Sequence, residues 1–401
     1  MANIYPVAGI QIGTTCAGIK QTELDDLALF QIDEGATCAA VFTRNAFCAA
    51  PVTVAKQHLN QTTPRYLLIN SGNANAGTGE QGMQDALSSC EIVGQHANCA
   101  ATEVLPFSTG VIGQTLPMEK IRAAIPHALQ NVGETAEHWQ RAAAAIMTTD
   151  TKPKLASKQI RIEGKTVTVT GISKGSGMIK PDMATMLAYV AIDANISQTV
   201  LQTCLTDATN QSFNRISVDS DTSTNDACVL VATGKADLAC IDSTEHPHYA
   251  ALAEAITEIC IQLAQAIVKD GEGATKFISI EILQGANQQE CLDVAYTIAH
   301  SPLVKTAFYA SDANWGRILA AVGRAGLQDF DIEKIKIYLG SVCIVENGGV
   351  AASYTEEQGQ AVMSESEITV RVELGRGQVQ ETVWTCDLSY DYVKINAEYR
   401  T

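Results

Sequence analysis

The sequence has little positive charge and few aromatic residues. It holds 27 Lys and Arg against 44 Asp and Glu, which gives a formal net charge of −17 at pH 7. Lys and Arg form no cluster, so a polyanion such as DNA would be repelled, and we expect no nucleic-acid partner. Aromatic residues make up 5% of the chain and hydrophobic residues 46%, which is typical of a globular protein with a core of small side chains.

Long apolar runs and paired cysteines are also missing. No uncharged apolar stretch reaches the roughly 20 residues that a membrane helix needs. The segment 1–15 lacks the basic region and the apolar core of a signal peptide. The twelve cysteines are scattered from Cys16 to Cys386 without a C-x-x-C pair. We therefore expect a cytoplasmic protein with buried free thiols, no metal site and no membrane contact.

Several common catalytic motifs are absent. The sequence contains no H-E-x-x-H, no G-x-S-x-G and no Walker loop. The segment 77–82, GTGEQG, fits G-x-G-x-x-G, but the strand before it is expected to end at Asn70, too early to place a pyrophosphate on a helix N-terminus. A glycine-rich loop is the better interpretation. His246 and His248 flank a proline with no third ligand nearby and predict a surface turn.

The hydrophobic pattern predicts an α+β protein with several sheets. The clearest helix is 251–270, where Leu252, Ile259 and Leu263 fall on one face. From about 280 onward the pattern is richer in strands and indicates a second lobe. Strands are predicted at 65–70, 186–194, 227–234, 277–283, 334–340, 367–375 and 382–389, a hairpin at 159–174, and further helices at 83–97, 118–132, 136–149 and 200–216.

The segment 174–194, KGSGMIKPDMATMLAYVAIDA, changes at Thr185 from glycine and proline to an apolar run. A threonine hydroxyl is a weak nucleophile unless a base lies beside it, and an N-terminal threonine carries its own α-amine as that base. Cleavage after Ala184 would create such a terminus, and Gly175 and Gly177 permit the unusual backbone angles that cleavage requires. The alternative is a loop that enters a buried strand at Thr185 with nothing cut.

The same segment resembles the autoprocessing site of the ornithine acetyltransferase family, the bifunctional glutamate N-acetyltransferases of arginine biosynthesis. Ser220 departs from the family pattern, in which we expect glycine at this turn. Other segments resemble the family in order along essentially the whole chain: LINSGNANAGTGEQG, FSTGVIGQTLPMEKI, AIMTTDT, DTSTNDAC, VKDGEGATKF, SDANWGRILAAVGRAG, VENGG and VKINAEYRT.

The resemblance implies a fold and a processing event. The fold is an αββα sandwich similar to the N-terminal nucleophile hydrolases but of different connectivity, with an additional C-terminal α/β lobe. Cleavage between Ala184 and Thr185 gives an α chain, 1–184, and a β chain, 185–401, which assemble as an α2β2 heterotetramer. In the β chain, about 185–280 completes the catalytic lobe with the α chain, and about 281–401 forms the C-terminal lobe.

The resemblance also implies the reaction. An acetyl group moves from N2-acetylornithine to glutamate by a ping-pong mechanism, with Thr185 as the nucleophile and an acetyl-threonine ester between the two steps. Thr109 and Gly110, in FSTGVIG, match the oxyanion hole that stabilises the tetrahedral intermediate. No cofactor is implied, although acetyl-CoA is an additional donor in some family members, and the sequence leaves its use here open.

Five further residues match the substrate contacts of the family. Lys174 suits an amino-acid carboxylate and Thr148 a hydrogen bond. Glu272 suits the side-chain ammonium of ornithine or a proton transfer. Asn396 and Thr401 match the C-terminal contacts, and Thr401 is the last residue of the sequence, so its carboxylate is available as well.

Two alternatives stay open at this point. An N-terminal-threonine amidohydrolase or aminopeptidase would share the first chemical half-step at Thr185 but pass the acyl group to water. A binding protein would keep an intact chain and would need no nucleophile. The sequence also leaves open which group, the Thr185 amine, Glu272 or a water, carries the proton.

Overall fold

The protein is described by a computed structural model that covers residues 3–20, 23–180 and 186–398. The chain forms two compact units. The first comprises Met1–Asn214 and Asp221–Ile267, and the second comprises Arg215–Ser220 and Val268–Thr401. Ala184, Thr185 and Thr401 lie outside the described residues, so the division into α and β chains stays a prediction.

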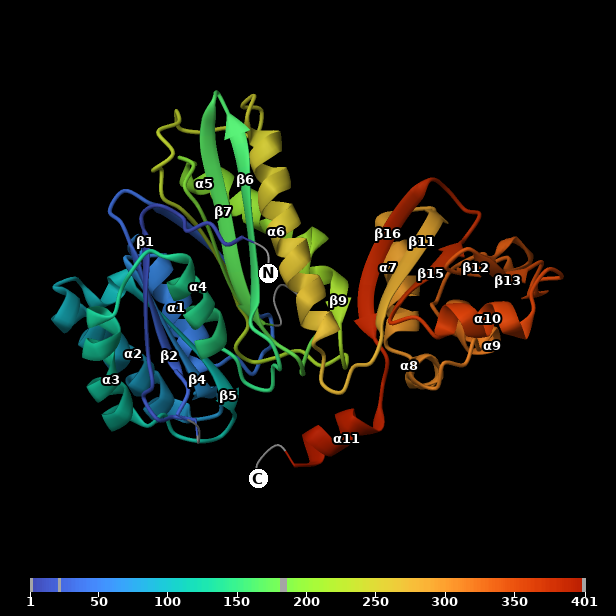
Figure 1. Ribbon diagram of the computed structural model, residues 1–401, viewed down its shortest axis with the longest axis horizontal. Coiled ribbons are helices and arrows are strands. Elements are labelled where there is room, and N and C mark those ends of the chain that lie inside the picture. The colour runs from blue at the N-terminus through green and yellow to red at the C-terminus, as the bar shows by residue number, and fades with distance from the viewer. Residues whose placement is uncertain (1–2, 21–22, 181–185, 399–401) are drawn as a thin grey trace. The chain divides into compact units, whose positions relative to one another are not determined.

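Two β-sheets lie face to face in the first unit (Figure 1). The strand order is β1-β2-β4-β5 in one sheet and β3-β10-β8-β7-β6 in the other. The strands are β1 (Ile10–Thr15), β2 (Leu27–Ile32), β4 (Tyr66–Asn73) and β5 (Val104–Val111), then β3 (Thr37–Phe42), β10 (Ala227–Ala232), β8 (Leu187–Ile192), β7 (Lys165–Lys174) and β6 (Lys154–Ile162).

Aromatic side chains, scarce in the sequence, gather in the core between these sheets. Phe30 of β2 and Phe107 of β5 come from one sheet and Tyr189 of β8 from the other, and all three are at most 2% exposed. Tyr189 lies between the two phenylalanines, with ring centroids 5.5 Å from Phe30 and 5.3 Å from Phe107. Large rings bury much apolar area per residue, so this cluster holds the two sheets together.

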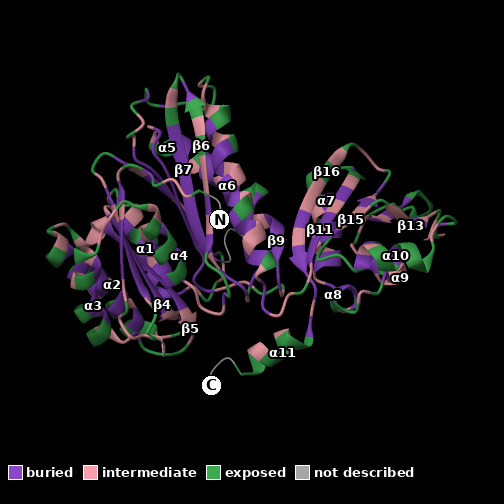
Figure 2. Cartoon of the chain, viewed as in Figure 1, coloured by how far each residue is buried: buried purple, intermediate pink, exposed green. Residues whose placement is uncertain are grey.

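Helices cover the outer faces of both sheets, which confirms the expected αββα sandwich (Figure 2). Apolar residues at helical spacing face inward, and the charged residues lie on the outside. Ala142 and Ile146 contribute to the core between the sheets, so α4 closes its side. The helices are α1 (Ala50–Leu59), α2 (Gly79–Ala97) and α3 (Met118–Gln130) on the four-stranded sheet, α5 (Gln198–Gln211) and α6 (Tyr249–Lys269) on the five-stranded sheet, and α4 (Ala136–Ala145).

Among the described helices, α6 is long and apolar enough to cross a membrane by length and composition. Half of its apolar window is nevertheless buried in the protein. Ile259 and Leu263 pack against Gly171 of β7, where a Cβ atom would lie 3.0 Å from the Leu263 side chain and 3.3 Å from that of Ile259. The apolar composition of α6 is therefore explained by its packing against the sheet as a core helix.

The second unit is the expected C-terminal α/β lobe. One seven-stranded sheet has the order β14-β13-β12-β15-β11-β16-β9 and packs against helices through a continuous apolar core. Its strands are β9 (Ile216–Ser217), β11 (Phe277–Gly285), β12 (Lys336–Leu339), β13 (Val342–Glu346), β14 (Gly349–Val350), β15 (Glu367–Glu373) and β16 (Val379–Cys386), and its helices are α7 (Gln288–Ala299), α8 (Pro302–Tyr309), α9 (Trp315–Gly323), α10 (Glu356–Met363) and α11 (Tyr390–Ala397).

The strongly patterned elements were predicted at the right places, although the helices α7, α8 and α9 were not predicted. A second difference lies in the glycine-rich segment 77–82. The structure begins α2 at Gly79 instead of leaving a loop there. A Cβ atom at Gly82 would lie 1.8 Å from Thr78 Oγ1, so only glycine permits this tight first turn. The side-chain amide of Asn75 then donates to the Gly82 carbonyl at 2.9 Å and fixes the start of the helix.

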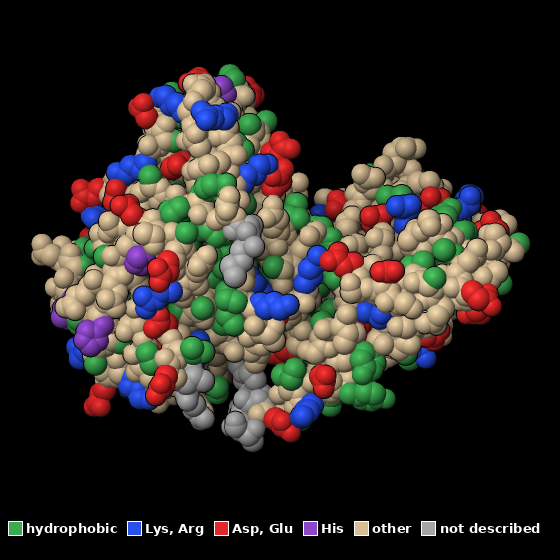
Figure 3. Space-filling view, in the orientation of Figure 1, with side chains coloured by type: hydrophobic (Ala, Val, Ile, Leu, Met, Phe, Trp, Pro, Cys, Tyr) green, Lys and Arg blue, Asp and Glu red, His purple; other side chains and the backbone are tan. Residues whose placement is uncertain are grey.

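The cysteines and the surface charges agree with the sequence. All twelve cysteines are free thiols, and seven of them are buried. On the face shown in Figure 3, Lys and Arg side chains are interspersed with Asp and Glu. Ion pairs at the surface include Lys165–Asp237 and Arg65–Glu34. Pairs of this kind contribute about 0–1 kcal/mol each and chiefly balance the charge of the surface locally.

Candidate active site

Strand ends of both sheets meet at one end of the first unit. The Lys174 ammonium, at the end of β7, donates a hydrogen bond to Thr109 Oγ1, near the end of β5, at 3.0 Å. Lys174 is also paired in register with Leu187, the first residue of β8. Thr185 lies two residues before Leu187 in the sequence, outside the described residues. Two of the predicted site residues are therefore in direct contact, beside the strand that follows the predicted cleavage point.

Gly110 continues from Thr109 in a backbone conformation that needs glycine. Its φ is 135°, and a Cβ atom there would lie 2.3 Å from the carbonyl carbon of Gly72 and 2.5 Å from Asn73 N. Gly72 is its partner in β4, and the register shifts at the next residue. The bulge brings two backbones into contact and turns peptide groups away from regular pairing, an arrangement that frees N–H donors at sites of chemistry.

Asp150 connects the loop after α4 with the glycine turn after β7. Its carboxylate accepts hydrogen bonds from Thr148 N at 3.0 Å, Gly175 N at 2.7 Å and Lys154 Nζ at 2.5 Å. The side chains of Asp150 and Lys154 are buried. Thr148, a predicted substrate contact, is thereby held through its backbone near the residue that follows Lys174.

The ionisation of Asp150 follows from these partners. Burial by itself would raise the pKa of the carboxyl group, but the charges of Lys174 and Lys154 and the N–H of Gly175 bring the pKa below its ordinary value. The carboxylate form is therefore the stable one at neutral pH. It supplies a fixed negative charge that balances the buried Lys154 and stands close to Lys174.

Asn225 and Asp226 also lie at this end, just before β10, and their individual roles were not predicted. The Asn225 amide donates to the carbonyls of Ala74, at 2.6 Å, and Ser108, at 2.9 Å, and so joins the ends of the two sheets. Burial raises the pKa of Asp226 well above its ordinary value, despite hydrogen bonds from Ser223 and the charge of Lys174. Within the described ranges, Asp226 Oδ2 has no hydrogen-bond partner. The segment DTSTNDAC was the only signal for either residue.

The predicted contacts in the second unit form a separate pair. Asn396 of α11 donates from Nδ2 to Glu272 Oε2 at 2.8 Å. Glu272 is 8% exposed and lies in the turn between α6 and β11. Beside it, a Cβ atom at Gly273 would lie 2.5 Å from Tyr392 N and 2.6 Å from Ser389 Oγ. The C-terminal segment thus packs closely on the turn that carries Glu272.

The same turn is fixed from its other side. The Asp387 carboxylate, at the end of β16, accepts Thr275 N at 2.8 Å, Thr275 Oγ1 at 2.5 Å and Lys276 N at 2.9 Å. The structure therefore brings the described site residues together in two groups, each within its own unit. Thr109, Gly110, Thr148 and Lys174 belong to the first unit, and Glu272 and Asn396 to the second.

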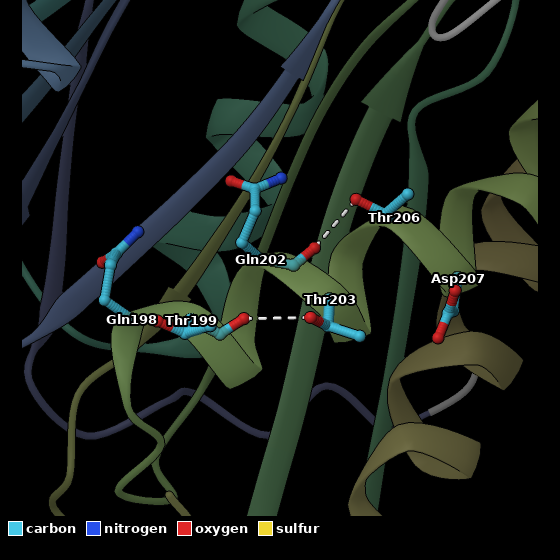
Figure 4. A pocket seen from close by; sticks show the side chains of 6 residues that line it. All are labelled: Gln198, Thr199, Gln202, Thr203, Thr206 and Asp207. Carbon is cyan, nitrogen blue, oxygen red and sulfur yellow. Dashed lines mark hydrogen bonds between the residues drawn. The ribbon is translucent and has the colours of Figure 1, made fainter. Parts of the chain in front are cut away.

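An open hollow along α5 is not part of either group (Figure 4). Gln198 exchanges hydrogen bonds with the backbone of Cys38, at the free edge of β3. The hydroxyls of Thr203 and Thr206 donate to carbonyls one turn earlier in the helix. Gln198 thus covers part of the edge of β3, which protects it from pairing with other chains, and the two threonine hydroxyls are used within the helix. In the described part of the chain, no group of three His, Cys, Asp or Glu is arranged to hold a metal ion.

Solved structures and known sequences resemble the chain. A crystal structure of arginine biosynthesis bifunctional protein ArgJ from Bacillus halodurans is 43% identical, with a TM-score of 0.49 over 51% of this chain and 95% of that chain. Ornithine acetyltransferase from Mycobacterium tuberculosis, complexed with ornithine, is 36% identical, with a TM-score of 0.40 over 45% of this chain and 94% of that chain.

Similarity in sequence extends along nearly the full length. Arginine biosynthesis bifunctional protein ArgJ from Pseudomonas syringae pv. tomato is 57% identical over 398 residues, which are 99% of this chain and 98% of that protein. The model of the ArgJ family matches residues 11–401. With this coverage and identity, the chain belongs to the ArgJ family.

Proposed function

We propose that this protein is a glutamate N-acetyltransferase of arginine biosynthesis, which moves an acetyl group from N2-acetylornithine to glutamate. Its relatives are named as bifunctional proteins of arginine biosynthesis. This pathway uses small soluble substrates, and we propose a cytoplasmic location. Acetyl-CoA is the second acetyl donor to test, because members of the family differ in their use of it.

The reaction proceeds in two acyl transfers. The Thr185 hydroxyl attacks the acetyl carbonyl of acetylornithine, the C–N bond breaks, and the α-amine of ornithine leaves with a proton. The α-amine of glutamate then attacks the ester on Thr185, which releases N-acetylglutamate and restores the hydroxyl. The free α-amine of Thr185, with an ordinary pKa of about 7.7–8.0, is the proposed proton carrier in both transfers. It takes the Thr185 hydroxyl proton and passes it to the leaving ornithine amine, and it then takes a proton from the attacking glutamate amine and returns it to the Thr185 oxygen.

The hydrogen bond between Lys174 and Thr109 is the observation that carries the proposal. Because Thr109 Oγ1 accepts a hydrogen bond from the Lys174 ammonium, its own O–H is directed elsewhere and is available to donate to an oxyanion. The adjacent Gly110 lies where the register between β4 and β5 shifts, and its backbone N–H is proposed as the second donor. Such donors typically contribute about 3–4 kcal/mol each to the transition state.

The remaining residues are proposed as substrate contacts. Lys174 and Thr148 bind the amino-acid part of the substrate from the first unit. Glu272, oriented by Asn396, binds the side-chain ammonium of ornithine, and Thr401 completes this contact at the C-terminus. A buried carboxylate with one hydrogen bond from an amide suits a cation of this kind.

Maturation is part of the proposal. Thr185 becomes a nucleophile with its own base only after cleavage of the Ala184–Thr185 bond. The α chain, 1–184, and the β chain, 185–401, then remain together as an α2β2 heterotetramer. The sheet pairing of β7 with β8 spans this bond and would hold the two chains together after cleavage.

The first experiment is intact mass measurement under denaturing conditions with N-terminal sequencing. Two fragments, the second beginning Thr-Met-Leu-Ala, are the expected result. A single uncut chain that still transfers acetyl groups would remove Thr185 from the mechanism. Thr185→Ala, which keeps the fold but lacks the hydroxyl, is the matched variant and is expected to stay uncut.

The second experiment identifies the products from acetylornithine with and without glutamate. N-acetylglutamate and ornithine in equal amounts, and little acetate when glutamate is absent, are expected. Free acetate at the same rate in both cases would replace the transferase proposal with an amidohydrolase. Replacing acetylornithine with acetyl-CoA in the same assay decides whether the protein has one acetyl donor or two.

A further inference from the structure

Lys20 lies at the end of a short loop that one buried carboxylate fixes. Asp26 is fully buried and accepts hydrogen bonds from the backbone N–H groups of Ala17 at 2.6 Å, Ile19 at 2.5 Å and Lys20 at 3.0 Å. Three bonds to one carboxylate define the backbone of this loop. The direction in which the Lys20 side chain leaves it is therefore fixed as well.

That side chain lies against the strand pair of the proposed oxyanion hole. A Cβ atom at Gly72 would lie 3.1 Å from Lys20 Cγ, so the aliphatic part of Lys20 crosses directly over Gly72. Gly72 is the register partner of Gly110. Glycine at position 72 thus leaves room for a lysine beside the peptide groups that are proposed to stabilise the oxyanion.

The ammonium of Lys20 is only partly used by the protein. Among the residues that the structure describes, it donates one hydrogen bond, to the Ala145 carbonyl at 3.1 Å, and an ammonium has three N–H donors. No carboxylate in the described ranges forms an ion pair with it. The neighbouring carboxylates are occupied elsewhere, since Asp25 pairs with Arg141 and Asp150 with Lys154. Burial lowers the pKa of Lys20, as does the nearby charge of Lys174, while Asp26 and Asp150 oppose the shift.

Donor and acceptor differ in what they require from the site. Acetylornithine and glutamate share an α-carboxylate, which Lys174 can bind in each half-reaction. Their side chains carry opposite charges, however, so Glu272, which suits the ornithine ammonium, would repel the side-chain carboxylate of glutamate. The acceptor therefore needs a further cation, and Lys154 is already neutralised by Asp150.

We propose that Lys20 binds the side-chain carboxylate of the acceptor and so selects glutamate in the second half-reaction. This inference rests on the proposed acetyl transfer. A lysine that served only as a cap for the C-terminal carbonyls of α4 would affect stability and both half-reactions alike. A lysine that reads the acceptor side chain affects one substrate and leaves the other unchanged.

Kinetics of the two half-reactions separate these roles. In a ping-pong mechanism, kcat/KM for each substrate reports only its own half-reaction. Lys20→Met keeps the aliphatic stem and removes the charge. We expect kcat/KM for glutamate to fall about 10- to 100-fold, the usual effect of losing a charged hydrogen bond. The value of kcat/KM for acetylornithine should stay within about two-fold of wild type, a change smaller than the loss of one hydrogen bond would cause. The preference for glutamate over glutamine should fall by a similar factor.

Two controls complete the test. Lys120, whose ammonium donates to the Gly18 carbonyl of the same loop, is exposed, and Lys120→Met should leave both half-reactions unchanged. Lys20→Arg keeps the charge and should recover part of the activity with glutamate. Equal losses for both substrates in Lys20→Met, or an unchanged preference for glutamate, would overturn the inference. A wild-type protein that makes no N-acetylglutamate would instead overturn the proposed function itself.

Discussion

Lys174 and Thr109 are 65 residues apart in the sequence, yet the lysine ammonium donates to the threonine hydroxyl at 3.0 Å. The bond joins β7 of one sheet to β5 of the other at the end where β8 begins. In this bond the hydroxyl oxygen is the acceptor, so the hydroxyl can still donate a hydrogen bond to a third group.

Thr109→Val removes the hydroxyl and keeps the shape of the side chain. We expect kcat to fall about 10²- to 10³-fold, because one oxyanion donor is lost, while Thr109→Ser retains most of the activity. Steady-state kinetics of acetyl transfer measure both variants. If the valine variant kept more than half of the wild-type kcat, Thr109 would have no part in stabilising the oxyanion.

Gly110→Ala places a methyl group 2.3 Å from the carbonyl carbon of Gly72 and strains a residue with φ of 135°. The strands must separate, so we expect loss of activity and a lower melting temperature. Gly113→Ala is the matched control, since Gly113 also has a positive φ but a Cβ atom there meets nothing within 4 Å. If both variants had the same activity and the same melting temperature, the close approach of the two strands would not be required for either.

Asp150→Asn removes the carboxylate that forms a buried ion pair with Lys154, and breaking such a pair typically costs about 3–5 kcal/mol. Because the pKa of Asp150 is lowered in the folded state, its contribution to stability is present above the unfolded pKa, about 3.9, and is lost as the pH falls through the folded value. Denaturant unfolding at several pH values should therefore show that the difference in free energy of unfolding between the variant and wild type becomes smaller below about pH 4.

Glu258→Gln is the control for this experiment. Glu258 pairs with Lys158 on the surface, where both side chains are more than a third exposed. Its loss should cost at most about 1 kcal/mol. An Asp150→Asn variant that was no less stable than Glu258→Gln would mean that the buried pair contributes little.

Glu272→Gln keeps an acceptor for the Asn396 amide and removes the negative charge. We expect kcat/KM for acetylornithine to fall about 10- to 100-fold, the usual effect of losing a charged hydrogen bond. Glu357→Gln, on an exposed part of α10, should have no effect. Unchanged kinetics with acetylornithine in Glu272→Gln would remove the carboxylate from substrate binding.

Ser220→Gly restores the residue expected from the family. Ser220 has φ of 67°, a left-handed conformation that costs a non-glycine residue about 1–2 kcal/mol. Glycine removes this conformational cost, but its greater flexibility in the unfolded chain offsets part of the stabilisation. The free energy of unfolding should therefore rise by about 0.5–1 kcal/mol. Ser364→Gly, at a right-handed helix end with φ of −79°, should be destabilising instead.

Local patterns in the sequence predicted most of the elements that surround the site. The apolar stripe of α6, the hairpin of β6 and β7 and the apolar run of β8 each carry a period that one chain segment shows by itself. The three helices α7, α8 and α9 fell in a region that the pattern described as strand-rich. The hydrophobic pattern of these short helices is similar to that of short buried strands. Their helical state therefore becomes clear only from their packing on the sheet.

The sequence determined the fold class and the residue types available for catalysis, because periodicity, turn residues and motif order are properties of the chain itself. Tertiary structure decided which of those residues meet. The contacts of Lys174 with Thr109 and of Lys20 with Gly72 join segments that are far apart in the sequence. Such contacts depend on how two sheets stack and where a bulge brings backbones together, and no local pattern encodes that packing.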